Sequence, residues 1–309
     1  MNIYHKAKKK LNKFRYGKFL YKDNFINSSR FYNLNKKINF VEFNERKKIK
    51  SNFENSLIEK IDRNIGFKKI SLNKINNKIS VLENLRNLRN NFDNIDWKSV
   101  EQDSKKKYLL SKRIEIDENI KQLIHFVLPV VANYIGTLPI LLDASYWLSP
   151  NNKNNNIGSQ KWHMDHEDVR QLKVFIGIDH DINDDTGSLN LIDKETTKKI
   201  YFQLSKYNKM ERGEKIDDIE FYRILKNKDK VIKCHQNLEE IYFVDTCSCY
   251  HYGSRQAIKK RKLLQLHFTS AFSTVVPFIF RKNFKQNGIL ENVLCYYKNN
   301  INYFDSISN

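Results

Sequence analysis

Cysteine is scarce in this chain of 309 residues, which contains only Cys234, Cys247, Cys249 and Cys295. These four residues are too few and too unevenly spaced to form the disulfide framework of a small secreted domain. The cysteine content therefore favours an intracellular protein.

The sequence also lacks a long apolar run. A secretory signal needs roughly 7 to 15 apolar residues after its basic start, and Lys18, Lys22 and Asp23 interrupt every such stretch. The longest later apolar stretch, residues 126–134, falls well short of the roughly 20 residues of a membrane span. We therefore expect a cytoplasmic protein without a transmembrane segment.

Acidic residues are outnumbered, since 35 Asp and Glu stand against 55 Lys and Arg and give a formal net charge of +20. Lys and Asn are abundant along the whole chain, including residues 151–156, which is typical of a general composition bias and does not indicate a nucleic-acid partner. The excess of positive charge is greatest in residues 1–50, where bases alternate with aromatic residues. This basic arm is a candidate to contact an anionic surface.

The length is compatible with one large domain and an appendage. Hydrophobic residues make up 40% of the chain, enough to bury a substantial core. We expect a basic, aromatic-containing extension at residues 1–70, a main domain at 71–285 and a tail at 286–309. Within the main domain, a helical lead-in covers 71–136 and a β-rich core covers 137–275.

Two helical patterns occupy the lead-in. Apolar residues recur at steps of three and four over residues 72–88, which predicts a helix that packs on the core. A second pattern covers residues 116–134, with Pro129 as a kink or break and Gly136 as the cap at the end of the helix.

From residue 137 the pattern changes to short β-branched and aromatic segments, which predict strands at 140–148, 172–178, 188–192, 241–244 and 263–269. Short strands separated by polar turns suggest an antiparallel sandwich or barrel. The charged interval 196–228 is expected to be a helical insertion between strands.

The most informative segment is Trp162-His163-Met164-Asp165. In an extended chain, residues two apart point to the same side, so His163 and Asp165 could reach one metal ion. An imidazole and a carboxylate suit a divalent iron, manganese or zinc ion. His251, which follows an apolar strand and a turn-rich stretch, would complete a set of two histidines and one carboxylate.

Such a set leaves three metal positions open. Non-haem iron oxygenases use these positions for a bidentate co-substrate and oxygen. A zinc hydrolase would use the same ligands with a bound water.

Arg261 lies ten residues beyond His251, at the start of an apolar, strand-like run. An Arg in such a strand is costly to bury without an anion. Its planar fork matches a carboxylate bidentately, so it is a fitting receptor for the distal acid of 2-oxoglutarate. Lys173, Gln171 and Tyr146, which lie in or next to predicted strands, are candidates to hold the inner carboxylate.

Taken together, these motifs resemble the phytanoyl-CoA dioxygenase-like branch of the Fe(II)/2-oxoglutarate oxygenases. The resemblance covers residues 138–273. It includes the Tyr146-Trp147 strand, the segment Gln160-Lys161-Trp162-His163-Met164-Asp165, the glycine turn Asp185-Thr186-Gly187-Ser188-Leu189, the distal histidine and the strand that begins at Arg261.

The resemblance implies a mainly β fold with flanking helices, built on a double-stranded β-helix (jelly-roll, cupin-like) core. It implies that His163, Asp165 and His251 bind Fe(II) and that Arg261 grips 2-oxoglutarate. The implied activity is that of a dioxygenase, which uses 2-oxoglutarate and O2, releases succinate and CO2, and hydroxylates a small-molecule substrate.

Two other functions remain open: a catalytically inactive barrel that binds a ligand or acts as an adaptor, and a metal-dependent hydrolase. The basic composition favours an anionic substrate, such as a phosphorylated, nucleotide-linked or coenzyme A-linked metabolite.

Other metal ligands are also conceivable. Cys247 and Cys249, with Asp245 and His251 nearby, could form a zinc site. A neutral imidazole near the site could replace a proposed ligand, and the candidates are His166, His180, His235 and His267.

Overall fold

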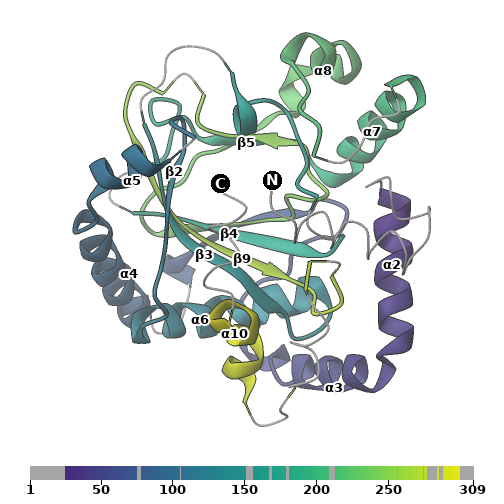
Figure 1. Cartoon of the computed structure of the whole chain (residues 1–309), viewed down its shortest axis with the longest axis vertical. Helices are drawn as coiled ribbons and strands as arrows, with labels where there is room; N and C mark the ends of the chain where they lie inside the picture. Colours follow the sequence, from purple (N-terminus) through teal and green to yellow (C-terminus); the bar gives the residue numbers. More distant parts are fainter. Residues whose placement is uncertain are drawn as a thin grey trace.

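The computed structural model describes residues 25–74, 78–104, 106–150, 156–166, 169–178, 181–208, 213–255, 257–273, 275–276, 284 and 288–299. In this part of the chain, two antiparallel sheets enclose an apolar layer, and helices flank the larger sheet (Figure 1). This sheet-rich jelly-roll arrangement confirms the predicted fold class.

The larger sheet, called here the major sheet, has the strand order β1-β7-β4-β9-β3-β2. Its strands are β1 (Phe67–Ser71), β7 (Glu240–Val244), β4 (Gln171–Gly177), β9 (Arg261–Thr269), β3 (Ile140–Ser149) and β2 (Leu110–Arg113). The minor sheet has the order β6-β5-β8 and consists of β6 (Ile232–Cys234), β5 (Leu189–Leu191) and β8 (His251–Tyr252). The five strands predicted from the sequence are all present, as β3, β4, β5, β7 and β9.

The two faces of the major sheet differ in chemistry because side chains alternate along each strand. On β9, Leu264, Leu266 and Phe268 belong to the main apolar core, whereas Leu263 packs in the cluster between the two sheets. Residues paired across the sheet share a face, so the face toward the minor sheet also carries the polar residues Gln265 and His267. We call it the inner face.

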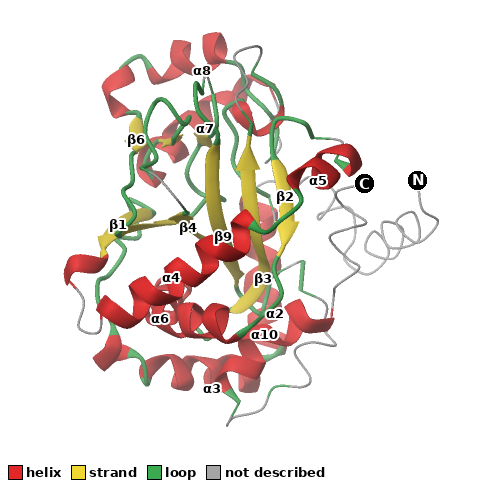
Figure 2. Ribbon diagram, turned by 90° about the vertical axis from the view of Figure 1, so that its left-hand side faces the viewer, coloured by secondary structure: helices red, strands yellow, loops and turns green. Residues whose placement is uncertain are grey.

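Helices pack on the opposite face. They include α4 (Lys78–Asp93), α6 (Glu118–Ile135), α10 (Ile289–Asn299) and α3 (Phe40–Ser51), and the main core contains side chains from all four. Figure 2 shows α3, α4 and α6 gathered at one end of the molecule, and α7 and α8 at the other. The helices α2 (Phe25–Ile38) and α5 (Trp97–Asp103) complete the described lead-in.

The predicted second helix is confirmed as α6. Asp117 caps its first turn by accepting a hydrogen bond from the Ile120 amide at 2.8 Å. The helix continues through Pro129, and Gly136 ends it with a left-handed φ of 89°.

The start of the first predicted helix is wrong. Leu72 lies in a short 3-10 turn (Leu72–Lys74) directly after β1, residues 75–77 lie outside the described residues, and α4 begins at Lys78. The apolar stripe is retained where it falls on α4, since Leu85 and Leu88 are buried.

The predicted domain boundary between residues 70 and 71 runs through β1, which pairs with β7 in the major sheet. On α3, Arg46 and Ile49 are buried, so the described segment from residue 25 packs as part of the domain rather than as an extension. Residues 1–24 of the basic arm lie outside the described residues. The predicted tail contributes α10, which buries Leu294 and Tyr297 against the main core.

The interval 196–228 is a helical insertion between β5 and β6, as predicted, and it contains α7 (Lys194–Asn208) and α8 (Asp218–Leu225). The ring of Phe221 on α8 stacks on Trp162, with centroids 3.9 Å apart and planes 8° from parallel. Arg255 Nη1 lies 2.7 Å from Asp218 Oδ1 and ties α8 to the chain beyond β8. The insertion thus braces the residue that precedes His163.

No helix in the described part of the chain is both long enough and apolar enough to span a membrane.

Candidate metal centre

A short backbone bridge places two histidines side by side. The amide of His163 donates to the His251 carbonyl at 3.0 Å, and the amide of His251 donates to the His163 carbonyl at 2.9 Å. Two residues later, the Asp165 amide donates to the Thr246 carbonyl at 2.9 Å. The pairing aligns the two chain segments, and the two imidazole centroids lie 4.3 Å apart.

The side chains of His163, Asp165 and His251 converge. Each offers one ligand atom, and these atoms lie within 4.8 Å of one another. No other group of three His, Cys, Asp or Glu side chains in the described residues comes together in this way. The structure therefore brings the three predicted ligands to one point, where they could hold a metal ion.

Backbone carbonyls set the orientation of both imidazoles. His163 Nδ1 lies 2.8 Å from the Lys161 carbonyl oxygen, and His251 Nδ1 lies 3.0 Å from the Cys249 carbonyl oxygen. A carbonyl only accepts hydrogen bonds, so each Nδ1 carries the proton and each Nε2 keeps a lone pair for a metal.

Both rings are held in the neutral form that binds metals. Burial, and for His163 the neighbouring His251, places the pKa of His163 well below its usual value. Burial also lowers the pKa of His251. The rings are 4% and 6% exposed, respectively, so little water competes for the Nε2 atoms.

Asp165 is the anionic member of the group. Burial opposes its ionisation, but the Lys173 ammonium holds the pKa of its carboxyl well below the usual range. Lys173 Nζ lies 2.8 Å from Asp165 Oδ2, whereas Asp165 Oδ1 lies 3.9 Å from His163 Nε2. One carboxylate oxygen is thus paired with Lys173, and the other is directed toward the histidines.

Gln171 connects this carboxylate to its surroundings. Its Nε2 donates to Thr246 Oγ1 at 2.8 Å and to Asp165 Oδ2 at 3.4 Å, and its Oε1 lies 3.1 Å from His267 Nε2. His267, which the sequence offers as an alternative ligand, lies outside the converging group and contacts Gln171 instead. Its signal in the sequence is a polar residue inside the apolar strand β9, two positions after Gln265.

Arg261 is a buried cation at the start of β9. The residue is 4% exposed. Among the described residues, its side chain makes one hydrogen bond, from Nη2 to Ser149 Oγ at 3.4 Å, and Nε has no partner. Burial lowers the pKa of Arg261 to about 10. Gly253 lets the guanidinium approach, because a Cβ there would lie 3.2 Å from both Nη atoms.

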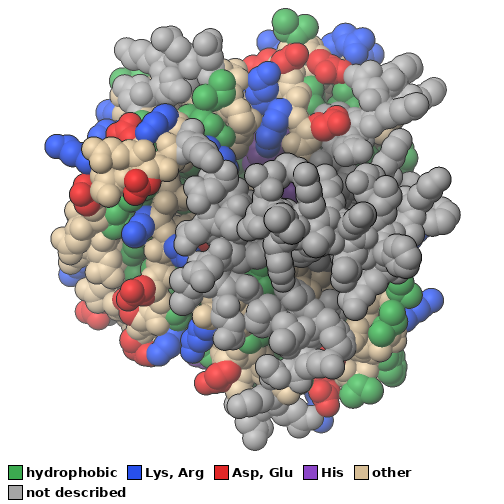
Figure 3. All heavy atoms as spheres, in the orientation of Figure 1, with side chains coloured by type: hydrophobic (Ala, Val, Ile, Leu, Met, Phe, Trp, Pro, Cys, Tyr) green, Lys and Arg blue, Asp and Glu red, His purple; other side chains and the backbone are tan. Residues whose placement is uncertain are grey.

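A cavity of about 1450 Å³ joins these groups, and its lining includes the three candidate ligands, Lys173 and Arg261. Figure 3 shows histidine side chains in a recess of the surface, with Lys or Arg side chains beside them. The metal centre and the buried arginine therefore open into one space.

Tyr146 is not brought to this site. Its hydroxyl donates to the Leu88 carbonyl at 2.9 Å, and its ring packs edge-on against Phe92, on the helix side of the major sheet. The neighbouring residues Ser145 and Trp147 line the cavity instead, because alternate residues of β3 face opposite sides.

The alternative histidine ligands lie elsewhere. His166 is exposed and outside the converging group, and His235 lies 3.1 Å from Asp184 in an exposed pair. His180 falls outside the described residues.

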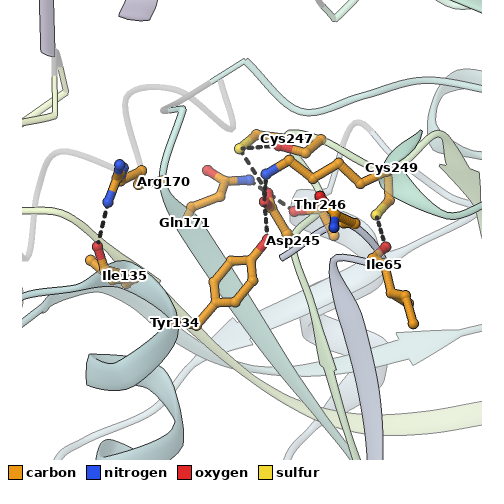
Figure 4. Close-up of polar contacts among 12 residues, drawn as sticks. Ile65, Tyr134, Ile135, Arg170, Gln171, Asp245, Thr246, Cys247 and Cys249 are labelled. Carbon is orange, nitrogen blue, oxygen red and sulfur yellow. Dashed lines mark hydrogen bonds and ion pairs between the residues drawn. The ribbon is translucent and has the colours of Figure 1, made fainter. Parts of the chain in front are cut away.

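The predicted zinc site at Cys247 and Cys249 is not formed. Cys247 Sγ donates to Asp245 Oδ1 at 2.9 Å, and Cys249 Sγ lies 3.6 Å from the Ile65 carbonyl oxygen (Figure 4). The two thiols therefore have separate partners.

Figure 4 also shows how Asp245 anchors the turn that leads to His251. Its side chain is fully buried and accepts hydrogen bonds from the Tyr134 hydroxyl at 2.6 Å and Lys194 Nζ at 3.2 Å. Its backbone carbonyl accepts from the amides of Ser248 and Cys249, both at 3.0 Å. Asp245 thus fixes the backbone that presents His251.

No protein family model matches the sequence, and no curated protein matches it. Solved structures with a similar course of the chain include EctD from S. alaskensis with 2-oxoglutarate and 5-hydroxyectoine, at 13% identity over 67% of this chain and 73% of that one, with a TM-score of 0.47. SnoK, a non-haem alpha-ketoglutarate-dependent carbocyclase from nogalamycin biosynthesis, is 10% identical over 68% and 81% of the two chains, with a TM-score of 0.43. HygX from Streptomyces hygroscopicus with nickel and 2-oxoglutarate is also 10% identical, over 68% and 84%, with a TM-score of 0.43. At such identities the likeness concerns the fold alone.

Proposed function

We propose that the protein is a non-haem Fe(II)- and 2-oxoglutarate-dependent oxygenase. The observation that carries the proposal is the buried guanidinium of Arg261, which lacks an anion among the described residues and shares a cavity with two histidines and one carboxylate. A buried cation of this kind is costly unless an anion completes it.

His163, Asp165 and His251 would hold the iron. Two neutral imidazoles and one carboxylate suit Fe(II) and leave positions open for a bidentate co-substrate and O2. Iron held there would allow O2 to oxidise the substrate together with 2-oxoglutarate, which would be converted to succinate and CO2.

The chain's own residues position the co-substrate. Arg261 binds the distal carboxylate of 2-oxoglutarate through its fork, with Ser149 holding Nη2. Lys173 pairs with Asp165 and lines the cavity, which supports two roles for it in the proposal. It orients the Asp165 carboxylate and contacts the inner carboxylate of 2-oxoglutarate.

The finer assignment is hydroxylation of a small-molecule metabolite by a cytoplasmic enzyme similar to the phytanoyl-CoA dioxygenase-like family. The substrate carries an anionic group, because among the described residues that line the cavity the exposed lysines outnumber the exposed acids. The exposed lysines that line it are Lys106, Lys112, Lys215 and Lys298, against the acids Asp103 and Glu115.

The runner-up activity is metal-dependent hydrolysis, which would use the same three ligands with a bound water. It gives no role to Arg261, which would then stay buried without an anion. An inactive binding protein would likewise have no need for neutral imidazoles around an ionised carboxylate.

The test is an anaerobic titration of the metal-free protein with Fe(II) and then with 2-oxoglutarate. We expect a weak visible charge-transfer band that requires both additions and is absent from His163→Ala. His235→Ala is the matched control, because His235 is an exposed histidine away from the centre, and it should keep the band.

If the protein binds iron but shows neither the band nor turnover of 2-oxoglutarate, the assignment would move to hydrolysis. A protein that binds no iron would be a binding protein.

A further inference from the structure

The inner face of β3 carries a second polar group within the cavity. Asp143, Ser145 and Trp147 follow one another at steps of two residues, and all three line the cavity. Asp143 pairs with His267 across the sheet, and His267 pairs with Lys173. Asp143 therefore stands on the same row as the lysine that holds Asp165, two strands away from it.

The side-chain donors to the Asp143 carboxyl both reach one oxygen, and the Ala144 amide also contacts the carboxyl. Ser145 Oγ donates to Oδ2 at 2.8 Å, and Gln265 Nε2 approaches the same oxygen at 3.4 Å. Within the described residues, Oδ1 accepts no side-chain hydrogen bond, and Asp143 takes part in no ion pair.

The neighbouring cations are engaged with other groups. Arg113 Nη2 donates to the Tyr297 carbonyl at 2.6 Å, and its guanidinium lies 4.0 Å from the centroid of the Tyr297 ring. Lys173 is paired with Asp165. Burial raises the pKa of the Asp143 carboxyl, although Ser145, Arg113 and Lys173 act in the opposite direction. A desolvated carboxyl of this kind is stabilised by a cation brought into the cavity.

Aromatic rings flank the same part of the cavity. Trp147 Nε1 donates to Ser145 Oγ at 2.8 Å, so the indole leans along the strand toward Asp143. The Phe175 ring lies 6.3 Å from the indole in an edge-to-face arrangement, and both rings line the cavity. A carboxylate beside aromatic rings is the combination that recognises an organic ammonium group.

We propose that this part of the cavity binds a protonated amine of the substrate, with Asp143 as its counter-ion and Trp147 and Phe175 as the adjoining walls. The inference rests on the proposed function in one respect: the amine is taken to be part of the molecule that is oxidised at the metal centre. It is compatible with an anionic group at the exposed lysines, and the substrate would then carry charges of both signs.

The test compares two probes that differ by one group, 4-amino-1-butanol and 1,4-butanediol, by calorimetric titration of the full-length, metal-free protein. The aminoalcohol should bind on the order of tenfold more tightly, because only the ammonium can pair with Asp143. Asp143→Asn keeps the shape of the side chain and should abolish this preference.

Asp103→Asn is the matched control, since it removes an exposed carboxylate that lines the same cavity and should keep the preference. Trp147→Leu should weaken binding of the aminoalcohol more than binding of the diol.

Equal affinities of the two probes for the wild-type protein would overturn the proposal, as would undetectable binding of the aminoalcohol. Neither result depends on a folded variant. A preference that survives in Asp143→Asn would overturn it as well. Because these titrations contain no iron and no 2-oxoglutarate, they decide the amine site separately from the oxygenase activity.

Discussion

Replacement of Arg261 by Met should separate the binding of 2-oxoglutarate from the stability of the fold. Methionine keeps most of the apolar length of the side chain and removes the charge. Without co-substrate, wild-type Arg261 holds its charge in a buried position where, among the described residues, Nε has no partner and Nη2 reaches only Ser149. The variant therefore loses a desolvated cation rather than a network of contacts.

The magnitude follows from the pKa of Arg261, which burial lowers from 12.5 to about 10. That difference corresponds to a free-energy cost of about 3 kcal/mol for keeping the guanidinium charged in the ligand-free protein. Arg261→Met should thus be at least as stable as the wild type in the absence of 2-oxoglutarate, unlike most substitutions of buried residues. Loss of the bidentate contact should cost 2-oxoglutarate binding on the order of 2 to 5 kcal/mol, or roughly 30-fold or more in Kd.

The assay is thermal unfolding with and without saturating 2-oxoglutarate, in the presence of Mn2+ as a redox-inert metal. The wild-type melting temperature should rise on addition of 2-oxoglutarate, and that of Arg261→Met should not, with Mn2+ affinity unchanged. Arg261→Lys keeps the charge without the fork and should recover only part of the effect. Arg223→Met, at an exposed position on α8, is the control for loss of a charge.

Two results would refute this reasoning. One is a free Arg261→Met protein that is several kcal/mol less stable than the wild type, which would mean that the guanidinium is already satisfied in the fold. The other is an unchanged 2-oxoglutarate affinity, which would move the carboxylate receptor to Arg255 or Lys173.

Three further substitutions test other parts of the structure. Asp143→Asn should raise the melting temperature at pH 7.5 but not below pH ~4. Folding raises the pKa of this carboxyl above its ordinary value of 3.8, so the wild-type protein becomes less stable as the pH rises above 3.8. Equal gains at both pH values would contradict this. Gly187→Ala should cost about 1 to 2 kcal/mol in urea unfolding, because Gly187 has a φ of 70° and a Cβ there would lie 3.0 Å from Ser254 Cα; an unchanged midpoint would contradict it. Asp245→Asn should lower the free energy of unfolding by about 3 to 5 kcal/mol and weaken metal binding, because it removes the partner of Lys194. Tyr134→Phe removes one neutral hydrogen bond and should lower the free energy of unfolding by only about 1 to 2 kcal/mol. Similar losses in the two variants would argue against a buried ion pair at Asp245.

The metal group could be predicted because its signal is local. His163 and Asp165 are two residues apart, and the extended backbone that puts both on one side is present at the bridge with His251. The glycine cap at Gly136 is another local signal, since a left-handed residue at a helix end favours glycine.

Strands at the edges of the sheets could not be predicted from their own residues. β1 has two lysines among five residues, and only Ile70 is buried. β2 likewise buries only Leu110 among its four residues. Among the described residues, each of these strands has a paired strand on one side only. Such strands need few apolar side chains, so their pattern does not stand out from a polar loop.

The choice between Tyr146 and its neighbours depends on register, which is a property of the assembled sheet. A shift by one residue exchanges the two faces of a strand. Tyr146 and Trp147 are adjacent aromatic residues, and the sequence alone does not say which faces the cavity. Once β3 is paired with β9, Trp147 lies opposite Leu263 on the inner face, and Asp143 lies there with it.

The division between the two faces of the major sheet also separates stability from function. On the helix side, α6 packs against Leu264, Leu266 and Phe268 in an apolar core, and this packing requires no ligand. On the inner face, Arg261 Nε and Gln265 Oε1 are buried without partners among the described residues. Unsatisfied polar atoms on this face are tolerated because the opposite face supplies the free energy of folding, and ligands that satisfy them add to it. The protein should therefore fold without metal or co-substrate, and its stability should rise with each ligand that enters the cavity.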